Sequence, residues 1–178
     1  AAGQWNETRG DNVLDGAAPY YGVYETKDGK HVSVGAIEAR FYAELIERLG
    51  LKGEPLPEQN DRGYWPRMRE RFAGIFRTRT RDEWCRVFEG SDACFAPVLT
   101  FTEGRKDTQA LARESFVDIG GIPQPRPAPR FSATPNGLPT PPPERGERGR
   151  EALADWGLPP EEIERLAGLG LGFARVTG

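Results

Sequence analysis

The chain has 178 residues, of which 37% are hydrophobic, and its formal net charge is −3. This length suits one domain, or one domain with extensions, and so small a charge gives no general attraction to nucleic acid or anionic lipid. No apolar run approaches the ~20 residues that span a bilayer, the N-terminus lacks a signal-peptide pattern, and two cysteines are too few for a disulfide framework. We therefore expect a cytoplasmic protein with no nucleic-acid or membrane partner and no metal centre.

The N-terminal half begins with two β-prone runs, residues 20–24 and 31–37. Asp28-Gly29 lies between them and predicts a hairpin turn. Residues 39–49 then place apolar side chains at helical spacing and are followed by a glycine in a C-terminal cap position. The segment is expected to form an antiparallel hairpin followed by an amphipathic helix.

The following segments predict further short elements. Thr80 and Glu83 have the spacing of a capping box, which favours a helix start at that point. Pro97 argues that the strand containing it lies at a sheet edge or a bend. Helices are expected over 65–76, 80–90 and, more weakly, 105–113, and a buried strand is expected over 93–99.

Composition changes sharply after this region. Nine of the sixteen prolines fall between residues 123 and 143, which excludes a helix and favours extended chain. Two short helices broken at 157–160 follow, with too little apolar surface to fold alone. The predicted fold class is α/β, with a small α+β domain of hairpin, short strands and helices. The predicted divisions are a linker at 1–16, the small domain at 17–118, a proline-rich extended strap at 119–144 and C-terminal helices at 145–178.

Glu38 occupies the junction in "VGAIEARFY", where an apolar strand-like run gives way to a helix-like one. The simplest interpretation is an acid in the first turn of the helix, which the helix dipole stabilises by about 0.3–1 kcal/mol. The same dipole favours the ionised carboxylate, which is suited to orienting a neighbouring histidine. The residues alone leave both interpretations open.

Other reactive side chains have ordinary structural interpretations. His31 lies beside the predicted turn and is expected to be exposed. Cys85 and Cys94 are expected to be packing residues, in a helix and in a buried strand. The arginines between 67 and 81 are expected on the solvated face of two helices. The stretch "DNVLDGAAPYY" predicts a tight entry to the hairpin or, alternatively, a ligand-facing loop.

Five segments together resemble the α-methylacyl-CoA racemases of the family III CoA-transferase (CaiB/BaiF-like) superfamily. They are "RGDNVLDGAAPYYGVY", "DGKHVSVGAIEARFYAELIERLGL", "RDEWCRVFEGSDACFAPVLTF", "RPAPRFSATP" and "REALADWGLPPEEIERL", in chain order. The resemblance implies an isomerase of fatty-acid metabolism that inverts the α-carbon of 2-methylacyl-CoA thioesters by moving protons. Acyl-CoA is then the substrate, and no cofactor is expected.

The resemblance also implies roles for particular residues. The glutamate of the family's "GAIE" motif corresponds to Glu38 and would orient the catalytic histidine, whereas Leu14, Tyr21 and Ile37 fall at positions that line the acyl side of the pocket. The family's catalytic histidine and aspartate lie in an N-terminal large domain that precedes this segment. The expected partners are therefore that large domain and a second copy in an interlocked homodimer. The strap and last helices would pack on the large domain, and the chain alone is expected to be inactive.

Two alternatives remain at this point. One is a family III CoA transferase, which forms an acyl-aspartate intermediate on an aspartate of the large domain. The transferases of the formyl-CoA type tend to carry a run of glycines where this chain has "LDGAAP" at 14–19, which favours the racemase. The other is a non-catalytic interaction module from a truncated or split gene.

Overall fold

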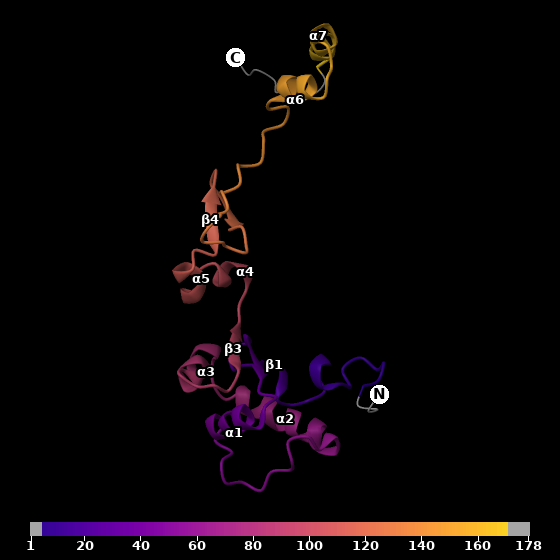
Figure 1. Cartoon of the computed structure of the whole chain (residues 1–178). Coiled ribbons are helices and arrows are strands. Elements are labelled where there is room, and N and C mark those ends of the chain that lie inside the picture. Colours follow the sequence, from indigo (N-terminus) through magenta and orange to yellow (C-terminus); the bar gives the residue numbers. More distant parts are fainter. Residues whose placement is uncertain (1–4, 171–178) are drawn as a thin grey trace. The chain divides into compact units, whose positions relative to one another are not determined.

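The computed structural model describes residues 5–170 and divides into two compact units, with the division between Gly104 and Arg105. Figure 1 traces the elements of both units along the chain. Within the described residues, no helix is long and apolar enough to cross a membrane.

The first unit is built on a three-stranded antiparallel sheet of order β1-β2-β3. The backbone hydrogen bond from Thr26 N to Lys30 O, 2.8 Å long, closes the predicted hairpin turn, in which Gly29 has a φ of +71°. A φ in this region favours glycine, so the Asp-Gly signal located the turn correctly. The strands are β1 (Tyr21–Glu25), β2 (His31–Gly35) and β3 (Phe95–Val98).

Helices cover one face of this sheet. The helix α2 packs on β1 and α3 packs on β3, as Figure 1 shows. Thr80 and Glu83 form the predicted capping box at the start of α3. The helical elements of the unit are η1 (Val13–Asp15), α1 (Ala39–Arg48), η2 (Arg62–Tyr64), α2 (Trp65–Phe76), α3 (Arg81–Phe88) and α4 (Phe101–Gly104).

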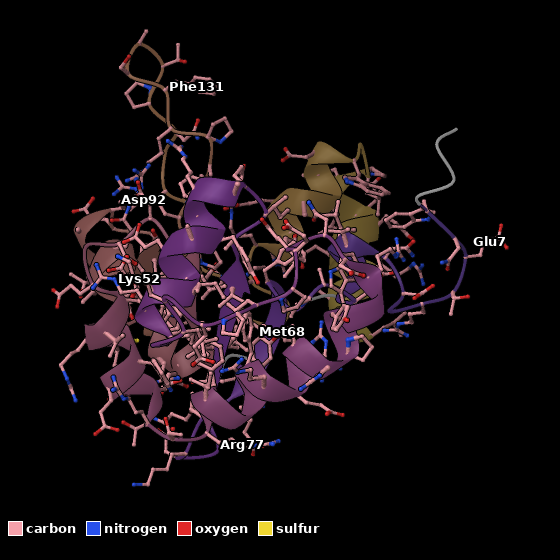
Figure 2. The ribbon with its side chains drawn as sticks, turned by 90° about the horizontal axis from the view of Figure 1, so that it is seen from below. Glu7, Lys52, Met68, Arg77, Asp92 and Phe131 are labelled. Carbon is pink, nitrogen blue, oxygen red and sulfur yellow. The ribbon has the colours of Figure 1, made fainter. Side chains whose placement is uncertain are left out.

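An aromatic core fills the space between sheet and helices. Phe72 and Phe76 are fully buried, and the Tyr24 ring stacks on Phe76 with centroids 5.0 Å apart. Met68, labelled in Figure 2, is also part of this core. On the opposite face of the sheet Val23 is 54% exposed, so the described residues leave this part of the face uncovered. The buried core residues are Ala18, Tyr20, Tyr24, Val32, Val34, Ala36, Leu45, Ile46, Leu49, Leu51, Trp65, Met68, Phe72, Phe76, Trp84, Phe88 and Ala93.

Two predictions about burial are wrong. Cys94 is exposed and precedes β3 with a φ of +50°, because the strand begins only at Phe95 and its outer face is uncovered. Arg81 is buried rather than solvated, because its guanidinium makes a bidentate ion pair with Glu103. Arg69 also turns inward, donating to the carbonyl of Ala18 at 3.0 Å.

The second unit contains short elements only. Part of the predicted strap forms β5, whose Ile122 pairs with Ile119 of β4 in a tight hairpin. From 126 to 144 the described chain has no helix or strand, and its role as a strap stays a prediction. The two expected C-terminal helices are present up to residue 170, and residues 171–178 and 1–4 of the predicted end segments lie outside the described residues. The elements are α5 (Thr108–Ala112), β4 (Phe116–Ile119), β5 (Ile122–Pro125), α6 (Gly149–Asp155) and α7 (Pro160–Gly168).

Candidate functional site

Glu38 lies at the N-cap of α1, not within its first turn as expected. Its backbone is extended, with φ −71° and ψ 140°, and the helix begins at Ala39. The carboxylate makes no capping hydrogen bond, and within residues 5–170 it has no ion-pair partner. Glutamate is not among the residues that favour the N-cap position. The side chain is exposed and free to interact with a group outside this unit.

The backbone that leads to Glu38 is held firmly by the sheet. Gly35 donates its N–H to the carbonyl of Cys94 at 2.9 Å, and Ala36 donates to the carbonyl of Tyr20 at 3.0 Å. The first bond ties the last residue of β2 to the residue before β3, and the second ties the next residue to the one before β1. The strand-to-helix junction is therefore an ordered part of the fold rather than a loose connection.

Tyr21 and Ile37 lie at the same end of the sheet as Glu38. Tyr21 is paired with Gly35, and an added Cβ on Gly35 would lie 3.9 Å from the Tyr21 ring. Ile37 is directly adjacent to Glu38 and is 40% exposed. The structure thus brings these three predicted site residues to one edge of the first unit.

Leu14 is carried by η1, which contacts β1. Leu14 is 57% exposed, and the buried residue of this turn is Asn12. The side-chain amide of Asn12 donates to Asp15 Oδ2 at 2.8 Å, while the Asn12 backbone N–H donates to Asp15 Oδ1 at 2.6 Å. The hydrogen bonds from Asn12 lower the pKa of Asp15. Sequence reasoning missed Asn12, although its spacing to Asp15 is that of a capping box.

Cys94 is also close to Glu38 in its electrostatic interactions, which was not predicted from the sequence. Partial desolvation raises the pKa of its thiol, and the negative charges of Glu38 and Asp92 raise it further. The thiol is therefore within electrostatic reach of the Glu38 carboxylate.

His31 is exposed and starts β2, at the far end of the strand from Glu38. About 13 Å of strand separates it from Gly35, since a strand rises about 3.3 Å per residue. Within this unit the imidazole is too far away to pair with Glu38.

The largest hollow described on the first unit lies elsewhere. It has a volume of about 600 Å³, and neither Glu38 nor any of the three predicted acyl-side residues lines it. Its wall is formed by the loop before α2 and by α2 itself, at Pro55, Leu56, Pro57, Asp61, Tyr64, Arg67, Met68 and Arg71. The groups around Glu38 form an open edge rather than an enclosed site.

Comparison with known proteins shows the family to which this chain belongs. The model of CoA-transferase family III matches residues 1–149, so the chain belongs to that family. Within it, the chain is 46% identical over 167 residues to the α-methylacyl-CoA racemase of Mus musculus, and 43% identical over 169 residues to that of Homo sapiens.

These alignments cover 92% and 91% of the chain but only 44% and 43% of the two racemases. The chain thus spans less than half the length of these relatives. A crystal structure of Rv3272 from M. tuberculosis has a similar fold, with a TM-score of 0.58 at 16% identity over 72% of this chain and 37% of that one.

Proposed function

We propose that this segment supplies Glu38 and part of the acyl pocket of an enzyme that inverts the α-carbon of 2-methylacyl-CoA thioesters. The observation that carries the proposal is the Glu38 carboxylate, which lies on a fixed junction yet has no partner among the described residues. The carboxylate is therefore available to a group outside this unit, and its backbone fixes where that group would meet it. The similarity to the racemases of mouse and human supports the same conclusion.

The chemistry requires one group to remove the α-proton and a second to deliver a proton to the opposite face. An ionised Glu38 would accept a hydrogen bond from a histidine, fix its tautomer and stabilise the imidazolium formed when it takes the proton. The histidine would come from the large domain that precedes this segment, since His31 lies at the other end of β2. The acid/base aspartate would come from there too.

Substrate contacts and assembly belong to the same proposal. Exposed Leu14 and Ile37, with half-buried Tyr21, would contact the acyl part of the substrate. Because these groups form an open edge, the site is completed only by another domain, which we propose is the large domain of a second copy in an interlocked, cytoplasmic homodimer. No cofactor is required, because both proton transfers use side chains.

The test is the Glu38→Gln variant of the intact enzyme that contains this segment. The amide keeps the size of the carboxylate but cannot stabilise an imidazolium, so solvent-deuterium exchange at the α-carbon of a 2-methylacyl-CoA should fall by about 10²-fold or more. CoA binding should change little, because Glu38 is assigned no CoA contact.

Glu70→Gln is the matched control, since Glu70 is an exposed glutamate on α2. It should exchange at the wild-type rate. Equal exchange rates for Glu38→Gln and wild type would contradict the role proposed for Glu38. Transfer of CoA between acids without α-proton exchange would instead identify a transferase.

A further inference from the structure

We propose that Gln59 is a positioning residue for Glu38, an inference that rests on the proposed function. The side-chain amide of Gln59 donates to the carbonyl of Ile37 at 2.7 Å and to that of Ala36 at 3.3 Å. These are the last two carbonyls before Glu38. One side chain from a loop 21 residues further along the chain thus holds the backbone at the point where β2 ends and α1 begins.

Gln59 is itself anchored in the core. Its backbone carbonyl accepts a 2.9 Å hydrogen bond from the indole N–H of Trp65, which is only 5% exposed. Trp65 packs edge-on against Tyr20, with ring centroids 6.0 Å apart. Next to Gln59, the side-chain carbonyl of Asn60 accepts a 2.8 Å hydrogen bond from the Tyr20 hydroxyl.

The junction is therefore held from two sides by connected groups. On one side, the backbone carbonyl of Tyr20 accepts a hydrogen bond from the N–H of Ala36. On the other, Gln59, in the loop that Tyr20 and Trp65 hold, donates hydrogen bonds to the carbonyls of Ala36 and Ile37. These bonds fix the peptide planes before Glu38 and hence the direction of its Cα–Cβ bond.

A purely structural role explains this arrangement less well. Ile37 and Glu38 are exposed, so water could satisfy the Ile37 carbonyl at little cost in free energy. What water cannot do is fix the orientation of the backbone. Orientation is decisive for a group that must meet a histidine from another domain, because an error near 1 Å can cost about 10²-fold in rate.

A double-mutant cycle on the intact enzyme separates positioning from general stability. Gln59→Ala should lower the kcat of α-proton exchange by about 10-fold and leave KM within about twofold, since the Glu38 carboxylate is retained but misplaced. In the Glu38→Gln background, Gln59→Ala should cause no further loss. Gln59→Glu, which keeps the size but replaces the donor with an acceptor, should resemble Gln59→Ala.

Gln109→Ala is the matched control, because it makes the same change of glutamine to alanine at an exposed position in α5. It should leave kcat unchanged. A loss of kcat with Gln59→Ala that is equally large in both backgrounds would overturn the proposal, because Gln59 would then act independently of Glu38. An unchanged kcat in the wild-type background would also overturn it.

A second measurement does not depend on catalysis. In the 178-residue chain, Gln59→Ala should accelerate amide hydrogen exchange in the peptide covering 35–42, while Gln109→Ala should not. If Glu38→Gln leaves the enzyme active but this local exchange rises, the proposed function fails and the structural role of Gln59 stands. Unchanged local exchange would overturn the role of Gln59 whatever the outcome for Glu38.

Discussion

The reactivity of the Cys94 thiol offers a test of whether the Glu38 carboxylate lies near it. Partial desolvation is the largest cause of its raised pKa, followed by the carboxylate of Glu38. A raised pKa keeps the thiol protonated near neutral pH, and only the thiolate is strongly nucleophilic. We expect Cys94 to react slowly with iodoacetamide despite its exposure.

Glu38→Gln should change this reactivity in a definite direction. Removing a negative charge near the thiol lowers the pKa of Cys94, so the alkylation rate measured at pH 8 should rise. The measurement needs a Cys85→Ser background, so that only the alkylation of Cys94 is counted. Glu70→Gln should leave the Cys94 rate at its original value, and an unchanged rate in Glu38→Gln would place the carboxylate away from the thiol.

At the scale of single residues, local patterns could be predicted from the sequence, whereas contacts between distant residues could not. The strand-to-helix change around Glu38 is a local pattern, so the start of the helix at Ala39 was predicted correctly, although the strand ends two residues earlier than expected. Contacts between distant residues leave no such pattern. Nothing in the spacing of Gln59 or Cys94 indicates that the fold brings them to Glu38.

Among the elements, α4 is attached to α3 by a salt bridge, and the same arginine also reaches the sheet. Arg81 of α3, whose side chain is 8% exposed, donates to both oxygens of Glu103 in α4, at 2.7 and 3.1 Å. The same guanidinium donates to the carbonyl of Val98 in β3 at 2.9 Å. The pair therefore links three elements at the C-terminal end of the first unit.

This link should make stability depend on pH. The hydrogen bonds from Arg81 hold the pKa of Glu103 well below its ordinary value of 4.5. A depressed carboxyl pKa means that the contribution is complete above the unfolded-state pKa and is lost as pH falls below about 4.5 toward the folded-state pKa. Glu103→Gln should lower Tm by several degrees at pH 7, because the buried Arg81 cation loses its bidentate carboxylate partner and keeps only the longer ion pair with Asp82.

Thermal unfolding followed across pH tests this expectation. The Tm difference between wild type and Glu103→Gln should shrink as the pH is lowered from 4.5. In that range the Glu103 carboxyl group takes up a proton in the unfolded wild type but stays ionised in the folded one, which favours unfolding. Glu70→Gln should follow the wild-type curve. A Tm difference that stays constant down to pH 2 would contradict the role assigned to the carboxylate.

Elements with strong local signals were predicted best. The Asp-Gly turn, the capping box and the proline in β3, which is an edge strand, all act through their own backbone, and each was located correctly. The burial of Arg81 depends on a partner 22 residues away and was missed. The pairing of β5 with β4 was missed because proline-rich sequence favours extended chain but does not specify what it pairs with.

At the scale of the whole molecule, the proposed function requires a divided active site. Glu38 lies on the first unit, and the sole histidine of the chain lies at the opposite end of β2. The motifs of the sequence were enough to predict the family, which the family match confirms. The proposed completion of the site by another domain stays a prediction, because it depends on residues outside this chain.

The isolated 178-residue chain should therefore show no α-proton exchange with a 2-methylacyl-CoA. Incubation in deuterium oxide followed by mass spectrometry of the thioester checks this directly, with the intact enzyme as the positive control. Measurable exchange by the purified chain would mean that its own residues hold a complete acid/base pair and that the site has been misplaced.

The position of the core within the chain also bears on how the protein is made. Every buried residue of the aromatic core lies between Ala18 and Ala93, and the Arg81–Glu103 link follows within ten residues. A ribosome adding about 5–20 residues per second takes about 4–15 s to add residues 105–178. The first unit can thus fold during translation before the proline-rich segment is complete. The strand-to-helix junction that carries Glu38 can therefore form before the proline-rich segment has been synthesised.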